Sequence, residues 1–349
     1  MQTRAAIHEG VGKKLLVDEI DLPDPAPDQV IVKLFSSGVC HSQLHQMHNP
    51  AAPTPLVLGH EGTGVVTHVG SAVTHLSEGD KAIVTWVPRT PLNGPLTPRL
   101  TGATYKGEPL NGFVYTWAED VLTDADFVVR IEEHHPNDLS CIVGCAVLTG
   151  AGAVLHTVNV RPGDSVAVYG VGGVGLSAIK AAAILEAYPV IAVDLTDDKL
   201  KFAKDFGATH LVNASKVDPV EAVKEISGGG VDFAFDAIGA RATTEQILPS
   251  TRAGGMGAEN LGGTAVLIGW PGDEMSINPL LFFQGQRQFR GSLGATYPDK
   301  DFPMYLRWHE EGKFPLDQLI TERFSLDQIN EACDALHAGK ILGRAIIEY

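Results

Sequence analysis

The most informative part of this chain is Ser165-Val-Ala-Val-Tyr169, followed by Gly170-Val-Gly-Gly-Val-Gly175. An apolar run of strand-forming residues ends in a glycine-rich turn, and strong helix formers follow from Leu176 onward. A strand, a G-x-G-x-x-G turn and a helix in this order are typical of a dinucleotide-binding unit. Gly170 allows the tight turn, Gly172 lets a pyrophosphate approach the backbone, and Gly175 lets the helix pack against the strand.

A second strand, Pro189-Val-Ile-Ala-Val193, ends in Asp194, an acidic residue at the expected distance past the glycines. A carboxylate there accepts hydrogen bonds from the adenosine ribose and repels a 2′-phosphate, so it favours NAD over NADP. An alternative interpretation makes Asp194 the N-cap of a helix over 197–206. The two roles are compatible, and we expect the ribose role.

The rest of the chain surrounds this unit with β structure. Strands and helices alternate from Ser165 to about Phe289, which predicts a doubly wound parallel sheet and an α/β fold class. The preceding residues read mostly as strands, with a long Pro- and Gly-rich loop at 87–112 and one helix over 139–158. Residues after about 294 predict two helices and a closing strand at 344–349.

Composition excludes several classes of function. The chain has 349 residues, 19% of them charged, and a net charge of −16, which argues against nucleic acid or an anionic membrane as partner. No apolar run approaches the length of a membrane span, and the first residues lack a signal core, so we expect a cytoplasmic protein. The four cysteines are too few for a disulfide framework.

Metal-ligand residue types gather upstream of the nucleotide-binding unit: Cys40, His41, His45, His60, Glu61 and Cys145. Zinc takes cysteine, histidine and carboxylate ligands, and a catalytic site leaves one position open. The spacings are too long for a local zinc motif. From residue types alone, buried cysteines and surface histidines are an equally good interpretation.

Four motifs resemble, in order, the signatures of zinc-dependent medium-chain alcohol dehydrogenases. They are Gly38-Val-Cys-His-Ser-Gln-Leu-His45, Gly59-His-Glu-Gly-Thr-Gly64, Gly144-Cys-Ala-Val-Leu-Thr-Gly150 and Gly170-Val-Gly-Gly-Val-Gly175. The resemblance covers essentially the whole chain. It implies a GroES-like, mostly-β catalytic domain of residues 1–147 and 294–349, and an inserted NAD-binding Rossmann domain of residues 148–293.

The resemblance also implies roles for single residues. Cys40, His60 and Cys145 match the catalytic zinc ligands, and Glu61 matches a carboxylate that approaches the metal during ligand exchange. Ser42 matches the hydroxyl residue that hydrogen-bonds the substrate alcohol, and His45 matches the outer end of the proton relay. The residues implied for the cofactor and the substrate pocket are His41, Thr149, Gly170, Gly172, Gly173, Val174, Gly175, Asp194, Lys199 and Arg344 for NAD, and Trp86 and Trp270 for the pocket.

Two features depart from the family pattern. Gln43 stands where the family usually has an acidic residue that orients the zinc-bound histidine, so zinc affinity is expected to differ. Residues 87–112 contain no cysteine, whereas many members hold a structural zinc with four cysteines in this lobe. We therefore expect one catalytic zinc per subunit and no structural zinc.

The expected function is a zinc- and NAD-dependent alcohol dehydrogenase that converts a primary or secondary alcohol to an aldehyde or ketone. It would act on a small molecule as a homodimer or homotetramer. The alternatives are a zinc-free quinone or enoyl reductase of the same superfamily, and a non-catalytic binding protein that retains the fold. The remaining candidates are interpreted as structural: Cys141 and Cys333 as buried residues, and His8, His48, His68, His75, His134 and His135 as surface residues.

Overall fold

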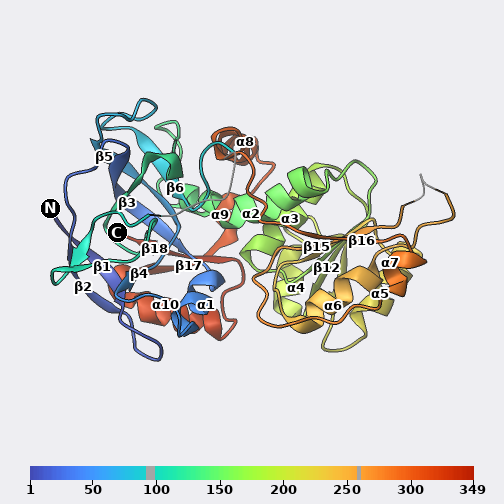
Figure 1. The fold of residues 1–349 in the computed structure, drawn as a ribbon. Coiled ribbons are helices and arrows are strands. Elements are labelled where there is room, and N and C mark those ends of the chain that lie inside the picture. Colours follow the sequence, from blue (N-terminus) through green and yellow to red (C-terminus); the bar gives the residue numbers. More distant parts are fainter. Residues whose placement is uncertain (92–98, 258–260) are drawn as a thin grey trace. The chain divides into compact units, whose positions relative to one another are not determined.

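The computed structural model describes residues 1–91, 99–257 and 261–349, and they form two compact units (Figure 1). The first unit comprises Met1–Cys145, Thr296–Gly312 and Leu316–Tyr349, and the second comprises Ala146–Ala295 and Lys313–Pro315. Part of the predicted loop at 87–112, residues 92–98, lies outside the described residues.

The second unit is built on a six-stranded sheet in the order β13-β12-β11-β14-β15-β16, in which every pair is parallel. This confirms the predicted doubly wound sheet, because the chain starts in the middle and adds strands on both sides. The strands are β11 (Val166–Tyr169), β12 (Val190–Asp194), β13 (His210–Asn213), β14 (Phe233–Asp236), β15 (Thr264–Leu267) and β16 (Gln288–Gly291).

Helices and close backbone contacts fix the glycine turn between β11 and the next helix. The helical segments of this unit are α2 (Ala146–Gly152), η3 (Ala153–Thr157), α3 (Gly173–Ile184), α4 (Asp197–Ala203), α5 (Pro219–Ser227), α6 (Arg241–Ser250) and α7 (Leu280–Phe283). Gly170 adopts φ of 87°, a conformation that favours glycine. A Cβ on Gly175 would lie 1.8 Å from the Gly170 carbonyl oxygen, so only glycine lets α3 start this close to β11.

The first unit contains two mostly antiparallel sheets. One has the order β4-β1-β2-β7-β8, and the other has the order β10-β6-β5-β3-β18-β17, with β9 also paired to β3. The strands are β1 (Gln2–His8), β2 (Leu16–Asp21), β3 (Gln29–Val39), β4 (Leu56–Val57), β5 (Glu61–Val69), β6 (Lys81–Thr85), β7 (Thr104–Tyr105), β8 (Glu108–Pro109), β9 (Asp120–Asp124), β10 (Val128–Arg130), β17 (Ile320–Ser325) and β18 (Arg344–Glu348).

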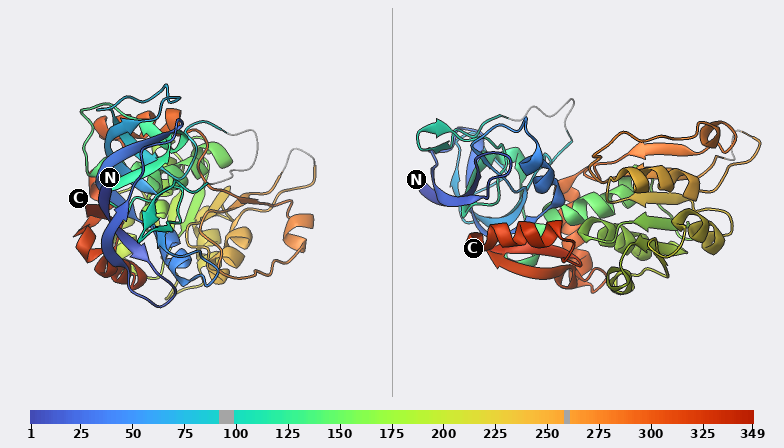
Figure 2. Two further views of the ribbon diagram at one scale, coloured as in Figure 1. Left: turned by 60° about the vertical axis from the view of Figure 1, so that its left-hand side comes forward. Right: turned by 90° about the horizontal axis from the view of Figure 1, so that it is seen from below.

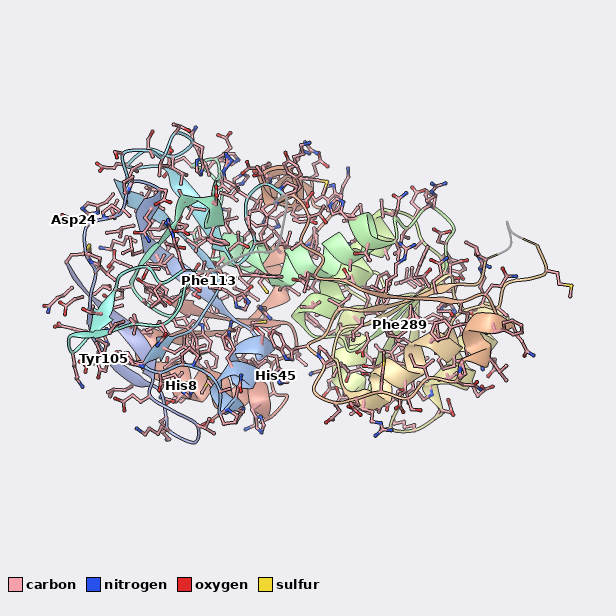
Figure 3. All side chains as sticks on the ribbon, viewed as in Figure 1. His8, Asp24, His45, Tyr105, Phe113 and Phe289 are labelled. Atoms are coloured by element: carbon pink, nitrogen blue, oxygen red, sulfur yellow. The ribbon has the colours of Figure 1, made fainter. Side chains whose placement is uncertain are left out.

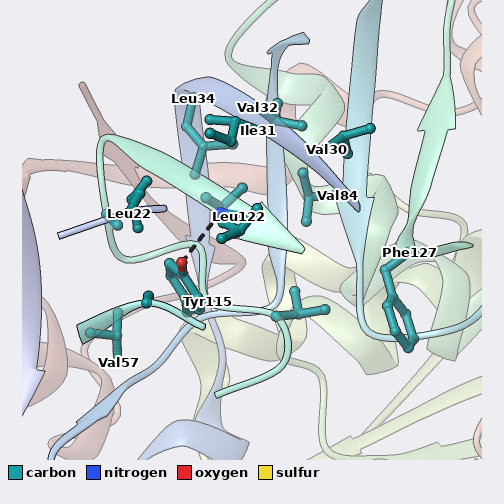
Figure 4. Packing of buried hydrophobic residues seen from close by; sticks show 14 of the residues in the cluster. Leu22, Val30, Ile31, Val32, Leu34, Val57, Val84, Tyr115, Leu122 and Phe127 are labelled. Carbon is teal, nitrogen blue, oxygen red and sulfur yellow. Dashed lines mark hydrogen bonds between the residues drawn. The ribbon is translucent and has the colours of Figure 1, made fainter. Parts of the chain in front are cut away.

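Two apolar clusters hold this unit together. One lies between the sheets and includes Val30, Val32 and Tyr115, whose hydroxyl oxygen accepts a hydrogen bond from the Leu122 amide at 3.3 Å (Figure 4). The other packs α10 against β17 and β18 (Figure 2).

The helical segments of the first unit are α1 (His41–His48), η1 (Ala125–Phe127), η2 (Leu139–Gly144), α8 (Pro298–Glu310), α9 (Leu316–Leu319), η4 (Leu326–Gln328) and α10 (Ile329–His337).

Two local predictions were wrong. The single helix expected over 139–158 is interrupted at Cys145, which leaves helical geometry with φ of −144° and ψ of −68°, so η2 ends before it, and α2 and η3 follow it without a further break. The C-terminal region contains β17 in addition to the closing strand, since Ile320–Ser325 pairs in parallel with β18 and extends the sheet.

Burial corrects the assignment of two histidines to the surface. His8 is buried at the end of β1, where the strand pairs with β4, and His135 is buried in the segment that leads into η2. Cys141 and Cys333 are buried, as predicted.

None of the helices in the described part of the chain is both long enough and apolar enough to cross a membrane.

Candidate active site

The register of one sheet brings distant segments of the first unit to a common edge. Val39 at the end of β3 pairs with Ala345 at the start of β18. Ser37 of β3 pairs with Gly62 at the start of β5. In antiparallel strands the end of one lies beside the start of the next. Cys40, which follows the end of β3, and His60, which precedes the start of β5, therefore meet.

Cys145 reaches the same edge through η2. The Thr85 hydroxyl at the end of β6 donates a hydrogen bond of 2.7 Å to the Gly144 carbonyl oxygen. Gly144 approaches β6 so closely that a Cβ there would lie 2.9 Å from the Val84 carbonyl oxygen. The non-helical backbone of Cys145 follows directly. The Gly144 contacts thus fix where the Cys145 thiol is presented.

Four potential metal ligands converge at this edge: Cys40, His60, Glu61 and Cys145. Their ligand atoms all lie within 4.8 Å of one another, and the His60 Nε2 to Cys145 Sγ distance is 3.1 Å. Gly38 makes room for the carboxylate, because a Cβ on this glycine would lie 2.4 Å from the Glu61 Cδ atom. Two thiols, one imidazole and a carboxylate are the donor types that zinc takes in proteins, so these residues fit that metal.

The groups of this cluster shift the pKa values of the two thiols in opposite directions. A hydrogen bond from the Cys145 thiol, with the charge of Arg344, holds the pKa of Cys40 well below its usual range. The same hydrogen bond and burial raise the pKa of Cys145. Burial raises the pKa of Glu61, and this side chain accepts a hydrogen bond from the Arg344 guanidinium, which is 5% exposed.

The side chain of Gln43 contacts two partners, the Cys40 amide and the His60 ring. Its Oε1 accepts a 2.9 Å hydrogen bond from the Cys40 amide, and its Nε2 is bonded to His60 Nδ1. Because the backbone amide can only donate, the amide oxygen of Gln43 is committed to Cys40. His60 Nδ1 then accepts, which leaves the proton on Nε2. A metal bound through Nε2 requires the opposite tautomer, with a proton on Nδ1 that meets the Nε2 donor of Gln43.

Helix α1 carries the predicted relay residues. Ser42 is half-buried, and its Oγ has no hydrogen-bond partner among the residues that the structure describes. His45 lies on the same helix (Figure 3), with its ring 5.2 Å from that of the exposed His41. Burial and His45 lower the pKa of His41. Trp86 follows β6, and its ring centroid lies 6.3 Å from that of His60.

The second unit places Asp194 beside the glycine turn. Its Oδ2 accepts a hydrogen bond of 3.1 Å from the Val171 amide, and its Oδ1 accepts one of 2.7 Å from the Leu195 amide. The N-cap of α4 is Thr196, so Asp194 does not have the alternative N-cap role. Lys199 is half-buried on the same helix.

The start of α3 leaves space for a ligand. Nothing lies within 4 Å of a Cβ built on Gly172, and Gly173 and Val174 form the first turn of the helix. A free helix N-terminus beside a glycine turn suits a phosphate group. Thr149 lies on α2, and its buried Oγ1 has no partner in the described ranges.

Arg344 and Trp270, predicted for NAD and for the substrate pocket, lie in different units. Arg344 belongs to the first unit and contacts Glu61 across 283 positions of sequence, a pairing that no local pattern indicates. Its role in binding NAD stays a prediction. Trp270 lies in the second unit and is 59% exposed. The parts played by Gly38 and Thr85 were missed, because only the strand register reveals them.

Two protein-family profiles match the chain. The alcohol dehydrogenase GroES-like domain matches residues 26–133, and the zinc-binding dehydrogenase domain matches residues 173–311. They fall largely in the first and second unit, respectively, so the mostly-β unit has a GroES-like fold and the parallel-sheet unit has a Rossmann-type fold.

Solved structures with these folds cover nearly the whole chain. An alcohol dehydrogenase zinc-binding domain protein from Burkholderia ambifaria is 30% identical, with a TM-score of 0.90 over 100% of this chain and 99% of that one. Benzyl alcohol dehydrogenase from Acinetobacter calcoaceticus is 29% identical, with a TM-score of 0.88 over 100% and 99%. An alcohol dehydrogenase from Thermus sp. ATN1 shares the fold at 23% identity, with a TM-score of 0.83 over 99% of each chain. The motifs, both folds and these relatives agree, and the chain belongs to the medium-chain alcohol dehydrogenase family of oxidoreductases.

Proposed function

We propose that this protein is a zinc-dependent alcohol dehydrogenase that transfers a hydride from a primary or secondary alcohol to NAD. The observation that carries the proposal is the convergence of Cys40, His60 and Cys145 beside Glu61. The glycine turn and Asp194 of the second unit support the choice of NAD. We further propose that the catalytic domain comprises residues 1–147 and 294–349, and that the Rossmann domain comprises residues 148–293.

Charge balance supports a divalent cation in the cluster. With both thiols and Glu61 ionised, the cluster carries three negative charges against the single positive charge of Arg344. Buried charges need compensation, and one divalent ion makes this set neutral. Metal binding would then release the proton that the raised pKa of Cys145 otherwise retains. Neither a zinc-free reductase nor a non-catalytic protein would require this set of donor residues.

The residues around the metal ligands supply the remaining steps. When bound, zinc supplies a Lewis acid that lowers the pKa of an alcohol hydroxyl. The Ser42 Oγ, which has no hydrogen-bond partner among the described residues, would accept a hydrogen bond from the alcohol and release its own hydroxyl proton as the alcohol proton arrives; His45 would release a proton to solvent. The ring of Trp86, close to His60, offers aromatic surface to the substrate.

We propose aromatic primary alcohols as the first substrates to test, since a 29% identical relative is a benzyl alcohol dehydrogenase. A homodimer or homotetramer in the cytoplasm is the expected state.

The decisive experiment pairs metal content with turnover of benzyl alcohol and NAD. Wild-type protein should retain one tightly bound zinc per chain after dialysis, and a chelator should abolish activity that added zinc restores. Cys145→Ala should lose zinc and activity together, because it removes one of three protein ligands. Cys333→Ala, which removes a buried thiol outside the site, should keep both. Full activity of Cys145→Ala, or of the zinc-depleted wild type, would contradict the proposal.

Asp194 should set the cofactor preference. Asp194→Asn keeps an acceptor oxygen for the Leu195 amide but removes the charge that repels a 2′-phosphate. The ratio of kcat/KM for NAD over NADP should fall by about tenfold or more, equivalent to about 1.4 kcal/mol, and Asp194→Gly should lower it further. Asp198→Asn, a charge loss on the exposed start of α4, should leave the ratio unchanged. A wild type that prefers NADP would overturn this assignment.

Gln43 should weaken zinc binding. In Gln43→Glu, two carboxylate oxygens accept from the Cys40 amide and from His60 Nδ1 at once, so the metal-binding tautomer is favoured. We expect zinc to bind about 10–100-fold more tightly, by analogy with other partners of metal-bound histidines. Competition with a chelator measures this. Gln46→Glu adds the same charge to the exposed face of α1 and should change little. Equal affinities in Gln43→Glu and the wild type would refute the tautomer argument.

A further inference from the structure

A second group of metal-ligand side chains lies in the first unit, apart from Cys40 and Cys145. His134 and His135 lie in the segment between β10 and η2, and Glu310 is the last residue of α8. Both imidazoles face the same carboxylate oxygen. His134 Nε2 lies 2.6 Å from Glu310 Oε1, and His135 Nδ1 lies 3.0 Å from it.

The geometry points to a surface site for a borderline divalent metal, which we propose is Zn²⁺ held by His134, His135 and Glu310. Two imidazoles and one carboxylate are a known ligand set for zinc, whereas calcium and magnesium prefer oxygen ligands. The ligand atoms of a tetrahedral zinc with bonds of about 2.0–2.1 Å lie about 3.3 Å apart. A retreat of the half-exposed Glu310 carboxylate by about 0.3–0.7 Å, together with adjustment of the exposed His134 ring, would admit the ion.

Part of the site is already rigid. His135 has a side chain only 7% exposed, and its amide donates to the Glu132 carbonyl oxygen at 3.2 Å. Lys81 donates to the carbonyl oxygens of His135 and Glu133, the latter at 3.0 Å. One ligand is therefore fixed, and two exposed ligands are able to adjust around it.

Burial lowers the pKa of His135 despite the nearby carboxylates of Glu310 and Glu132, which favours the neutral imidazole that binds metals. Metal binding here would also have a structural consequence. A bound ion would link the end of α8 to the segment that leads through η2 to Cys145. Because the ion would bind the folded chain and not the unfolded chain, its binding would also stabilise this unit. The surface position means that the ion exchanges, unlike the tightly bound zinc proposed above.

Calorimetric titration of Zn²⁺ into the dialysed protein that retains its tightly bound zinc tests the site. The wild type should bind one further equivalent. His134→Ala and Glu310→Gln should each weaken this binding by about tenfold or more, since even the loss of a residue behind a ligand costs 10–100-fold. Both positions are exposed, so folding should be preserved, whereas the buried His135 is left unchanged.

His68→Ala removes an exposed histidine of the same unit outside the group and should bind Zn²⁺ like the wild type. The absence of a further equivalent in the wild type would overturn the proposal. Unchanged affinity in His134→Ala and Glu310→Gln, or an equal loss in His68→Ala, would also overturn it. The titration needs no alcohol or NAD, so its outcome is independent of the proposed dehydrogenase activity.

Discussion

The ion pair between Glu61 and Arg344 is the interaction on which the metal-ligand edge of the first unit depends. Both side chains are almost fully buried; Glu61 is one of the four clustered potential ligands, and the charge of Arg344 acts on Cys40. A buried carboxylate without a partner is costly, and so is a buried guanidinium. The charges of Glu61 and Arg344 compensate each other, so both groups can stay ionised in the interior. The thiolate charge beside them is not compensated by this pair. A divalent ion would complete the balance.

Close backbone approach is the second constraint, and it acts in the same way in both units. Gly38 leaves the space that the Glu61 side chain fills, and Gly144 lets η2 reach β6 so that Cys145 arrives at the sheet edge. In the second unit Gly175 brings α3 against the turn at Gly170. Each of these glycines serves a contact that any larger side chain would prevent.

The sequence predicted the architecture because its signals are local. The alternation of strand and helix after Ser165 and the turn from Gly170 to Gly175 specify the parallel sheet directly. The group of potential metal ligands is different. Residue types left buried cysteines as an equal alternative for Cys40 and Cys145, and only the order of four motifs favoured a metal. The structure brings the ligands together through strand register.

Other features were beyond local reasoning. The contact of Arg344 with Glu61 spans 283 positions and depends on the pairing of β18 with β3. The burial of His135 beside Glu310 of α8 is a tertiary feature, which a residue type usually found at the surface does not reveal. The break of the expected helix at Cys145 is set by the Thr85 hydrogen bond to Gly144, which no helix propensity reveals.

Zinc binding by Cys40, His60 and Cys145 underlies the proposed activity. X-ray absorption at the zinc edge of the dialysed protein tests it most directly, because the method reports the ligand atoms themselves. We expect two sulfur ligands at about 2.3 Å and nitrogen or oxygen ligands at about 2.0–2.2 Å. A ligand shell without sulfur, or one of four sulfurs, would contradict it.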